Sequence, residues 1–303
     1  MAVDLSERRV KVWLLYLKHM RGVRGRLNLN ILREVCSFLH LRPNLLVDVT
    51  NSYIRFFDFQ KETWKQKRTL KPHIQADGDS SWVVLEGGSV FICGGRGWGI
   101  GTTTAYVVGE GCAEQARMQA GRYGHGVLAY SNQVYVFGGY NEDYMDHCEK
   151  YDLQQHTWTD LPRMQEPRAF FNPCLFNGSI YLCGCPSSLL EALSPQTDQM
   201  LPFQLTMPVE DSNCCMYVEN NLLVVHLNRL ILKYRAGLTE QLVQTSTSST
   251  QQECLWQNSQ PVVNTALRRY YIVNSGKCYS VDMDTGVWGP AIDQGPPESC
   301  VIA

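Results

Sequence analysis

The chain has 303 residues, 44% of them hydrophobic and 18% charged, which is enough to bury a sizeable core and excludes disorder as the default. The net charge of −2 is unevenly divided, because residues 1–42 carry nine Lys/Arg and three Asp/Glu, whereas the remainder carries 18 and 26. The apolar run from Val10 to Met20 contains two lysines and is followed by arginines instead of a cleavage site, so we expect no secretory signal. No stretch approaches the roughly 18 apolar residues of a membrane span. We therefore expect a cytoplasmic protein that does not bind a membrane.

Residues 5–41 are expected to be helical, since their apolar residues recur every three to four positions. Asn28 or Asn30 is a suitable cap for a second helix in this segment. The string LNLNILREVCSFL, residues 27–39, resembles the core of an F-box, which implies that residues 5–41 dock a ubiquitin-ligase adaptor. The leading Leu-Pro and the following Trp-containing helix usual in that motif are absent, so a pair of amphipathic helices packing on the rest of the chain stays open as the alternative.

The same segment is strongly basic. We interpret its charged side chains as a solvated helix face that complements the acidic remainder of the chain. No nucleic-acid-binding motif accompanies them, so we do not expect nucleic acid as a partner. These residues are Arg8, Arg9, Lys11, Lys18, Arg21, Arg24 and Arg26.

An eight-residue pattern recurs along the rest of the chain, as FDFQKETW at 57–64, YDLQQHTW at 151–158 and VDMDTGVW at 281–288. Upstream of the pattern stand apolar runs that end in small or polar residues, such as VFICGG at 90–95 and VYVFGG at 134–139. The fifth residues of six such runs, at positions 50, 94, 138, 184, 226 and 274, are 42 to 48 residues apart. A period of this length is typical of a repeat protein.

Each repeat is predicted to be a four-stranded antiparallel meander. Turn residues that tolerate positive φ, such as Ser131-Asn132 and Asn177-Gly178, join its first strand to its second. The aspartate of the eight-residue pattern ends the third strand and can accept hydrogen bonds from turn amides. The tryptophan opens the fourth strand and can bury its ring between neighbouring sheets. Four-stranded sheets at this spacing, stacked radially, form a β-propeller.

The repeat resembles the Kelch motif. The resemblance is carried by the glycine doublets Gly94-Gly95 and Gly138-Gly139, by Tyr151-Asp152 and by Trp158, and residues 122–162 are the best single copy. The doublet lets the chain approach its neighbour with no Cβ in the way. The copies around positions 184, 226 and 274 lack the doublet, so whether each is a full blade stays open.

This resemblance implies the fold and its division into domains. We expect an all-β fold in which residues 43–303 form a six-bladed Kelch-type β-propeller of four-stranded antiparallel blades, preceded by the helical segment 1–42. The chain ends in a spare strand-like segment, residues 298–303, and the first repeat lacks an innermost strand. Pairing of residues 298–303 with residues 45–49 is therefore expected to close the propeller and protect its open edge.

No established catalytic signature occurs in the sequence, so we expect no catalytic residue, no cofactor and no metal site. The glycine-rich stretch from Gly94 to Gly101 lacks dinucleotide-binding spacing, and we interpret it as a flexible loop between the second and third strands of its blade. The twelve cysteines are expected to be reduced thiols. Cys93, Cys174 and Cys183 lie in apolar runs, where a thiol acts as a small hydrophobe.

The loops that join second to third strands, and those that join blades, emerge on one face of a propeller. In the Kelch propellers that this chain resembles, that face usually holds the partner. Aromatic and Arg side chains dominate interface hot spots and are frequent in these loops. The candidate partner-binding residues are Arg96, Trp98, Arg122, Tyr123, Tyr140, Asn141, Asp143, Tyr144, Arg168, Phe170 and Asn213. For Arg122 and Arg168 the alternative is a repeat-borne arginine bonded to a neighbouring loop.

We therefore interpret the chain as a non-enzymatic, monomeric protein-interaction module. If residues 5–41 are an F-box, the module is the substrate-recognition subunit of a ubiquitin ligase. Two alternatives stay open, a Kelch-type enzyme that oxidises or modifies sugars and a cytoskeleton-associated protein. An oxidase needs tyrosines and histidines that bind copper, and a sugar enzyme needs a cluster of Arg, Glu and His; residue spacing indicates neither.

Overall fold

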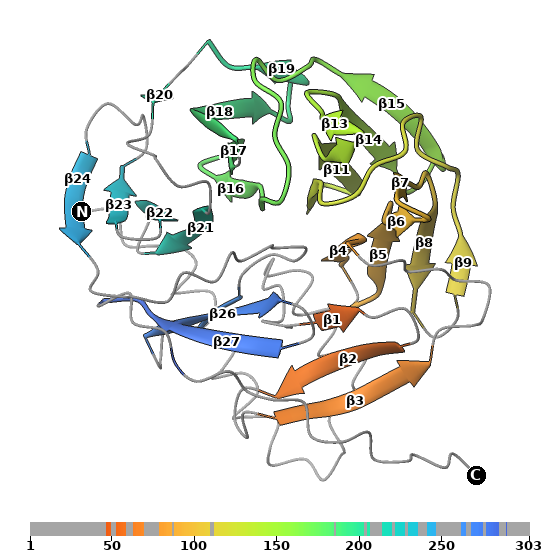
Figure 1. The fold of residues 1–303 in the computed structure, drawn as a ribbon, viewed down its shortest axis with the longest axis horizontal. Helices are drawn as coiled ribbons and strands as arrows, with labels where there is room; N and C mark the ends of the chain where they lie inside the picture. The colour runs from red at the N-terminus through yellow and green to blue at the C-terminus, as the bar shows by residue number, and fades with distance from the viewer. Residues whose placement is uncertain are drawn as a thin grey trace, which may run out of the picture. The chain divides into compact units, whose positions relative to one another are not determined.

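The computed structural model describes residues 47–49, 53–58, 63–69, 79–86, 88–109, 112–184, 186–202, 205–206, 214–219, 222–227, 230–235, 241–246, 262–264, 268–274, 277–284 and 289 (Figure 1). Two compact units are distinguished, residues 1–43 with 86–88 and residues 44–85 with 89–303, and every strand named below belongs to the second unit. The helices and F-box-like segment predicted in residues 1–42 lie outside the described residues, as does the closing strand predicted at 298–303. No helix capable of crossing a membrane is found in the described part of the chain.

Six antiparallel sheets of three to five strands follow one another along the described chain. The first contains β1 (Val47–Val49), β2 (Tyr53–Asp58) and β3 (Thr63–Thr69), and the second contains β4 (Ser81–Val84), β5 (Val90–Cys93), β8 (Ala105–Val108) and β9 (Cys112–Glu114). The third contains β10 (Gly126–Tyr130), β11 (Gln133–Phe137), β14 (Cys148–Asp152) and β15 (Thr157–Leu161). The fourth contains β16 (Cys174–Phe176), β17 (Ser179–Gly184), β18 (Ser187–Ser194), β19 (Gln199–Met200) and β20 (Leu205–Thr206).

The fifth sheet contains β21 (Cys214–Glu219), β22 (Leu222–Leu227), β23 (Leu230–Tyr234) and β24 (Gln241–Ser246), and the sixth contains β25 (Val262–Asn264), β26 (Arg269–Asn274) and β27 (Lys277–Asp282). Two further hairpins leave the second and third sheets between their second and third strands. They are β6 (Arg96–Gly97) with β7 (Ile100–Gly101), and β12 (Tyr140–Asn141) with β13 (Asp143–Tyr144).

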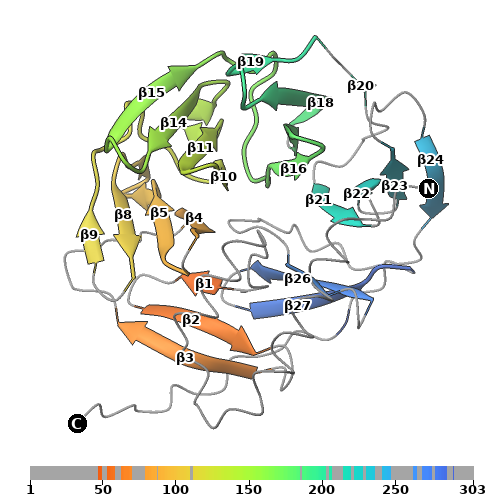
Figure 2. The ribbon, with the colours of Figure 1, turned by 180° about the vertical axis from the view of Figure 1, so that it is seen from behind.

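The predicted four-stranded meander is confirmed in the second, third and fifth sheets, whose strands pair in chain order. The order β4-β5-β8-β9 can be followed in Figure 1 and from behind in Figure 2. The fourth sheet departs from the meander because β18 pairs with β19 through Leu193 and with β20 through Leu189 and Leu190. The first and sixth sheets have three strands within the described residues.

The apolar runs form strands that are buried on both faces. In β11, Val134 and Val136 pack with the second sheet, whereas Tyr135 and Phe137, which alternate with them, pack with the fourth. Successive side chains of a strand point to opposite faces, so a strand between two sheets requires a continuous apolar run. The tight turn before β11 uses Ser131 and Asn132 at φ of 47° and 63°, as their residue types predict.

Buried side chains connect each sheet to the next in chain order. Each interface has its own cluster of nearly inaccessible hydrophobic residues, and their burial supplies most of the stabilisation of such a fold. One pair from each of the five interfaces is Ile54 with Val90, Phe91 with Tyr151, Phe137 with Leu182, Tyr181 with Val225, and Tyr217 with Tyr270.

The aspartate and tryptophan of the repeat have the predicted roles in the third sheet. The Oδ1 atom of Asp152 accepts hydrogen bonds from the backbone N–H groups of Gln154 and Gln155, both at 2.8 Å. The indole of Trp158 lies 4.9 Å from the Tyr151 ring and donates a hydrogen bond to the carbonyl oxygen of residue 116, which follows the second sheet. The tryptophan therefore ties one sheet to the segment that leaves the preceding one.

The glycine doublet allows a close approach between backbones. Gly138 and Gly139 adopt φ of 58° and 107°, and the N–H of Gly139 donates to the carbonyl oxygen of Arg168 at 2.9 Å. A Cβ at position 138 would lie 2.2 Å from that same oxygen. Only glycine fits this position, because both the positive φ and the contact exclude a side chain.

Candidate functional site

The glycine-rich stretch lies between the second and third strands of its sheet, as predicted, and forms the hairpin β6–β7. Its base is closed by the pairing of Arg96 with Gly101, and the N–H of Thr102 donates to the oxygen of Gly95 at 2.8 Å. These backbone hydrogen bonds join the two sides of the hairpin at its base, with Trp98 and Gly99 at the turn.

This hairpin is attached to the corresponding hairpin of the third sheet. The N–H of Gly101 donates to Oδ1 of Asn141 at 3.1 Å, and Tyr123 and Tyr140 exchange backbone hydrogen bonds of 3.1 and 2.8 Å. Asn141 thus serves as a bridge between β7 and β12. Equivalent loops of two consecutive sheets form one continuous surface.

Aromatic rings cover the junction between the hairpins. The ring of Tyr123 lies 5.5 Å from that of Tyr140 and 6.2 Å from that of Phe170, and Tyr140 meets Tyr144 edge-on at 5.3 Å. The guanidinium of Arg96 lies over the Tyr123 ring, 5.4 Å from its centroid, a cation–π geometry. The buried Tyr123 ring therefore connects the aromatic side chains of Tyr140 and Phe170 beneath the two hairpins.

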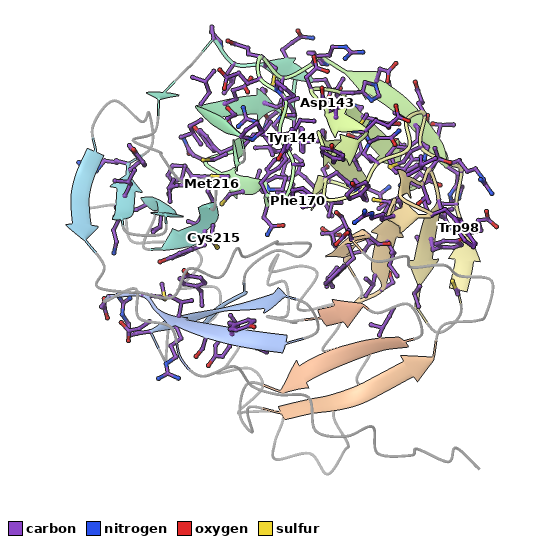
Figure 3. The ribbon with its side chains drawn as sticks, in the orientation of Figure 1. Trp98, Asp143, Tyr144, Phe170, Cys215 and Met216 are labelled. Carbon is purple, nitrogen blue, oxygen red and sulfur yellow. The ribbon has the colours of Figure 1, made fainter. Side chains whose placement is uncertain are left out.

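Six of the predicted residues are thereby brought together, and two more lie at the edges of this surface. Trp98 is fully exposed at the tip of β6–β7, and Asp143 is exposed on β12–β13 (Figure 3). We call these eight residues the loop face: Arg96, Trp98, Tyr123, Tyr140, Asn141, Asp143, Tyr144 and Phe170. Asn213, another candidate from the sequence, lies outside the described residues.

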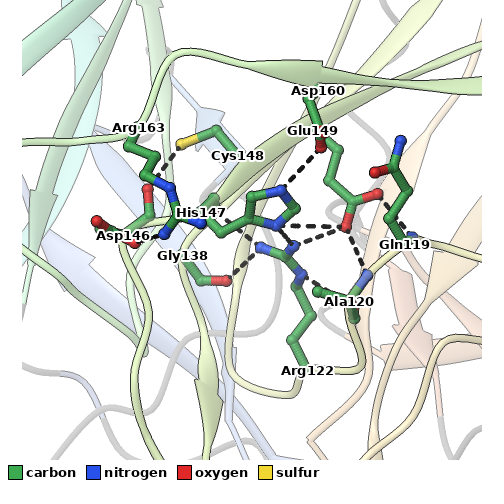
Figure 4. Close-up of polar contacts among 10 residues, drawn as sticks. All are labelled: Gln119, Ala120, Arg122, Gly138, Asp146, His147, Cys148, Glu149, Asp160 and Arg163. Atoms are coloured by element: carbon green, nitrogen blue, oxygen red, sulfur yellow. Dashed lines mark hydrogen bonds and ion pairs between the residues drawn. The ribbon is translucent and has the colours of Figure 1, made fainter.

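Arg122, in contrast, is completely buried and serves the interior. Its Nη1 donates to the carbonyl oxygens of Gly138 at 2.7 Å and His147 at 2.8 Å, and its Nη2 pairs with Glu149 at 2.6 Å (Figure 4). Burial lowers the pKa of the guanidinium, and the Glu149 carboxylate opposes that effect. All three of these contacts join Arg122 to residues of the third sheet or to residues that adjoin its strands.

The partners of Arg122 extend the network toward the surface. Its Nη2 also contacts Nδ1 of His147 at 2.5 Å, and Nε2 of that histidine lies 2.8 Å from a carboxylate oxygen of Asp160. Glu149 accepts hydrogen bonds from the backbone N–H groups of Gln119 at 2.9 Å and Ala120 at 3.4 Å. The ion pair therefore fastens the segment between the second and third sheets onto β14.

The same arrangement recurs one repeat later. Arg168 is fully buried, pairs with Glu191 of β18, and donates to the carbonyl oxygens of Leu182 and Leu189, both at 2.9 Å. Glu191 accepts from the N–H of Gln165 at 2.7 Å, as Glu149 accepts from Gln119. Arg122 and Arg168 thus have the internal role that the sequence left open beside partner binding.

Sequence reasoning missed the two glutamates. Strand register places them at one position, because Val136 lies opposite Glu149 and Leu182 lies opposite Glu191. In the second sheet the matching position, opposite Ile92, is occupied by Tyr106, so the pair is not repeated there. The sequence did contain a signal for these pairs. In two consecutive repeats, a glutamate within a strand follows the arginine of the repeat, 27 residues after Arg122 and 23 residues after Arg168.

One buried pair of chemically active groups lies beneath the loop face. The sulfur of Cys93 is 3.2 Å from Nε2 of His125, and both residues are inaccessible. Burial raises the pKa of the Cys93 thiol and lowers the pKa of His125 well below its ordinary value. A neutral thiol and a neutral imidazole behave here as packing groups, since a reactive cysteine is a thiolate with access to solvent. No cluster of three or more potential metal ligands was found in the described part of the chain.

The comparisons with known proteins agree with the repeat. A Kelch motif is matched at residues 121–165, which hold the third sheet, the glycine doublet Gly138-Gly139, and the Arg122–Glu149 pair. No curated protein matches the chain. The resemblance read from the sequence is confirmed for this repeat: residues 121–165 carry a Kelch motif.

Proposed function

We propose that the chain is a non-enzymatic protein-interaction module and that its partner binds the loop face. The observation that supports this most directly is the aromatic cluster in which half-buried Tyr140 and Tyr144 pack over buried Tyr123, flanked by exposed Arg96 and Trp98. Tyr, Trp and Arg are the residue types that dominate binding energy in interfaces. The Kelch motif supports the same class of function.

We extend this proposal to the whole architecture. The six sheets are the six blades of a propeller, and residues 298–303 complete the first sheet beside β1 and close it. The five interfaces between consecutive sheets support this arrangement, because one further interface, between the sixth sheet and the first, completes a ring of six. A cysteine pair introduced at Val47 and Val301 tests it: formation of a disulfide in the folded chain supports closure, and free thiols under the same oxidation contradict it.

The binding role is tested by quantitative affinity purification of the full chain from cells. We expect at least one protein to be retained by the wild type and lost with the double variant Tyr140→Ala/Tyr144→Ala. The matched control is Gln155→Ala, in the turn between β14 and β15, which should retain the same protein. Equal thermal stability of the two variants ensures that loss reflects the surface. Identical protein lists from all three chains would contradict the proposal.

The ligase role is the finer part of the proposal and rests on residues 27–39. In the full chain, Leu32→Asp and Val35→Asp should each abolish copurification of a ligase adaptor and leave the loop-face partner bound. Retention of the adaptor by both variants would remove this role. The enzyme class is tested separately by metal analysis, where one equivalent of copper in the purified chain would favour a Kelch-type oxidase.

A further inference from the structure

We propose that hairpin β6–β7 is an insertion element, and that Trp98 and Ile100 enter an apolar pocket with a basic rim on a protein partner. This inference rests on the proposed function and specifies its geometry. The usual expectation for a loop face is a surface that receives a peptide, whereas here the chain itself supplies the projecting group. The partner is thus a folded protein with a concave site.

The first argument is the exposure of two large apolar side chains. Trp98 has a relative exposure of 103% and Ile100 of 55%, and the only other large hydrophobic residue exposed in the described part of the chain is Val218, at 38%. A buried Trp removes 150–250 Å² from water, which makes it the strongest single anchor among the side chains. All four residues of β5, the strand that leads into the hairpin, are buried. The exposed apolar side chains of the hairpin therefore contrast with the strand beside them.

The second argument is the backbone at the tip. Trp98 and Gly99 form a two-residue turn with φ of 52° and 88°, the conformation that favours Asn-Gly and disfavours a bulky residue. A large side chain at positive φ is strained by roughly 1–2 kcal/mol. Local folding therefore does not explain Trp98, whereas a contact made by its indole does. The hairpin is already held at its base, so little order has to be gained when it binds.

The third argument is charge. Arg96 lies over the Tyr123 ring and near Asp79. Burial raises the pKa of Asp79, and the positive charge of Arg96 opposes this effect. Glu142 and Asp143, on the adjoining hairpin, are exposed, and no ion pair involves either of them among the described residues. Carboxylates on the adjoining hairpin favour a partner with basic groups around its pocket and oppose insertion into an anionic bilayer.

The net charge of the chain outside the basic segment agrees with this choice. Residues 43–303 carry 18 Lys/Arg and 26 Asp/Glu, so long-range attraction also favours a basic partner. A second copy of this chain, a lipid surface and the basic residues 1–42 of another copy are the other possible occupants. The experiment below separates each of them from a protein with a pocket.

The experiment places the photoreactive residue p-benzoyl-phenylalanine at position 98 of the full chain, and separately at positions 144 and 155, and illuminates cells that produce each chain. We expect one discrete protein adduct from position 98 and none from position 155, which lies in a turn at the other end of the third sheet. The captured protein is then purified and titrated against the wild type, Trp98→Asn and Glu142→Lys/Asp143→Lys. Asn suits the turn, so this variant should retain or increase the melting temperature.

The expected result is a loss of affinity of at least about 30-fold for Trp98→Asn, which corresponds to a hot spot of about 2 kcal/mol. Charge reversal at 142 and 143 should slow association and reduce its dependence on salt. Adducts from position 98 that consist only of a second copy of the chain or of lipid overturn the inference, as do a missing adduct and equal affinity for Trp98→Asn. Capture from position 144 without capture from 98 overturns this inference alone, whereas no capture from either position also contradicts the proposed function.

Discussion

Removal of the Arg122 side chain should destabilise the protein far more than removal of an exposed arginine. Arg122→Met keeps the apolar part of the side chain and deletes the guanidinium, so the Glu149 carboxylate stays buried without its ion-pair partner. The oxygens of Gly138 and His147 also lose a donor. The N–H groups of Gln119 and Ala120 still bind Glu149 but cannot neutralise its charge.

The magnitude follows from these contacts. Breaking a buried ion pair from one side costs about 3–5 kcal/mol, because a charge is left in a medium of low dielectric constant. The free energy of unfolding of a domain is about 5–15 kcal/mol, so roughly a fifth or more of it is expected to disappear. Arg117→Met is the matched control. Arg117 is 67% exposed and lies 3.8 Å from exposed Glu114, so its loss should cost less than about 1 kcal/mol.

Urea denaturation followed by circular dichroism measures both values. A third chain, Arg122→Met/Glu149→Gln, removes the stranded charge while keeping an oxygen acceptor, and should recover about 1–2 kcal/mol relative to Arg122→Met. Two results would refute the reasoning. One is a loss below about 1 kcal/mol for Arg122→Met. The other is a double variant no more stable than Arg122→Met, which would mean that the buried charge is not the source of the cost.

Three further predictions concern the repeat and its cysteines. Gly138→Ala should lower the free energy of unfolding by more than about 2 kcal/mol, because position 138 has a positive φ and a Cβ there would collide with the backbone oxygen of Arg168. The control is Gly109→Ala, where the new Cβ would meet its nearest neighbour at 3.5 Å. In the same urea assay this control should change the free energy of unfolding by less than about 0.5 kcal/mol. Maleimide labelling with peptide mapping should modify partly exposed Cys112 before Cys148, whose thiol is buried and has a pKa raised to about 12; equal rates for both would contradict the burial. Hydrogen bonds from two turn amides lower the pKa of Asp152, so its charge stabilises the fold above its ordinary pKa of about 3.9 and this stabilisation is lost as pH falls through the lowered value. Asp152→Asn should therefore lower the melting temperature at about pH 7 but not at about pH 2, and a decrease of equal size at both would be evidence against this account.

Local chemistry made the strands and turns predictable. The run Val134–Phe137 is apolar at every position because each face of β11 meets a different sheet. Asn132, Asn177 and Gly178 occupy the positive-φ positions that their residue types favour. These features depend on a few neighbouring residues, and so does the aspartate that closes its own turn.

The buried ion pairs could not be predicted in the same way. The partner of Arg122 is set by which strand lies beside the segment before β10, and no short stretch of sequence contains that information. The sequence left Arg122 and Arg168 open between partner binding and an internal bond. Arg and Glu are usually surface residues, so residue type alone did not predict that both arginines would be buried against Glu149 and Glu191. Likewise, glycine content alone did not predict the β6–β7 hairpin or the hydrogen bond from its Gly101 N–H to Asn141 of the next hairpin.

Among the described residues, the second to fifth sheets are each assembled from one uninterrupted stretch of chain, the third from Gly126–Leu161 and the fourth from residues 174–206. During synthesis, all strands of the third sheet leave the ribosome before those of the fourth. Tyr135 and Phe137 then form an uncovered apolar face until Ile180 and Leu182 arrive. A growing chain of this design exposes such a face after every completed sheet, so chaperone demand should rise and fall with the repeat during translation.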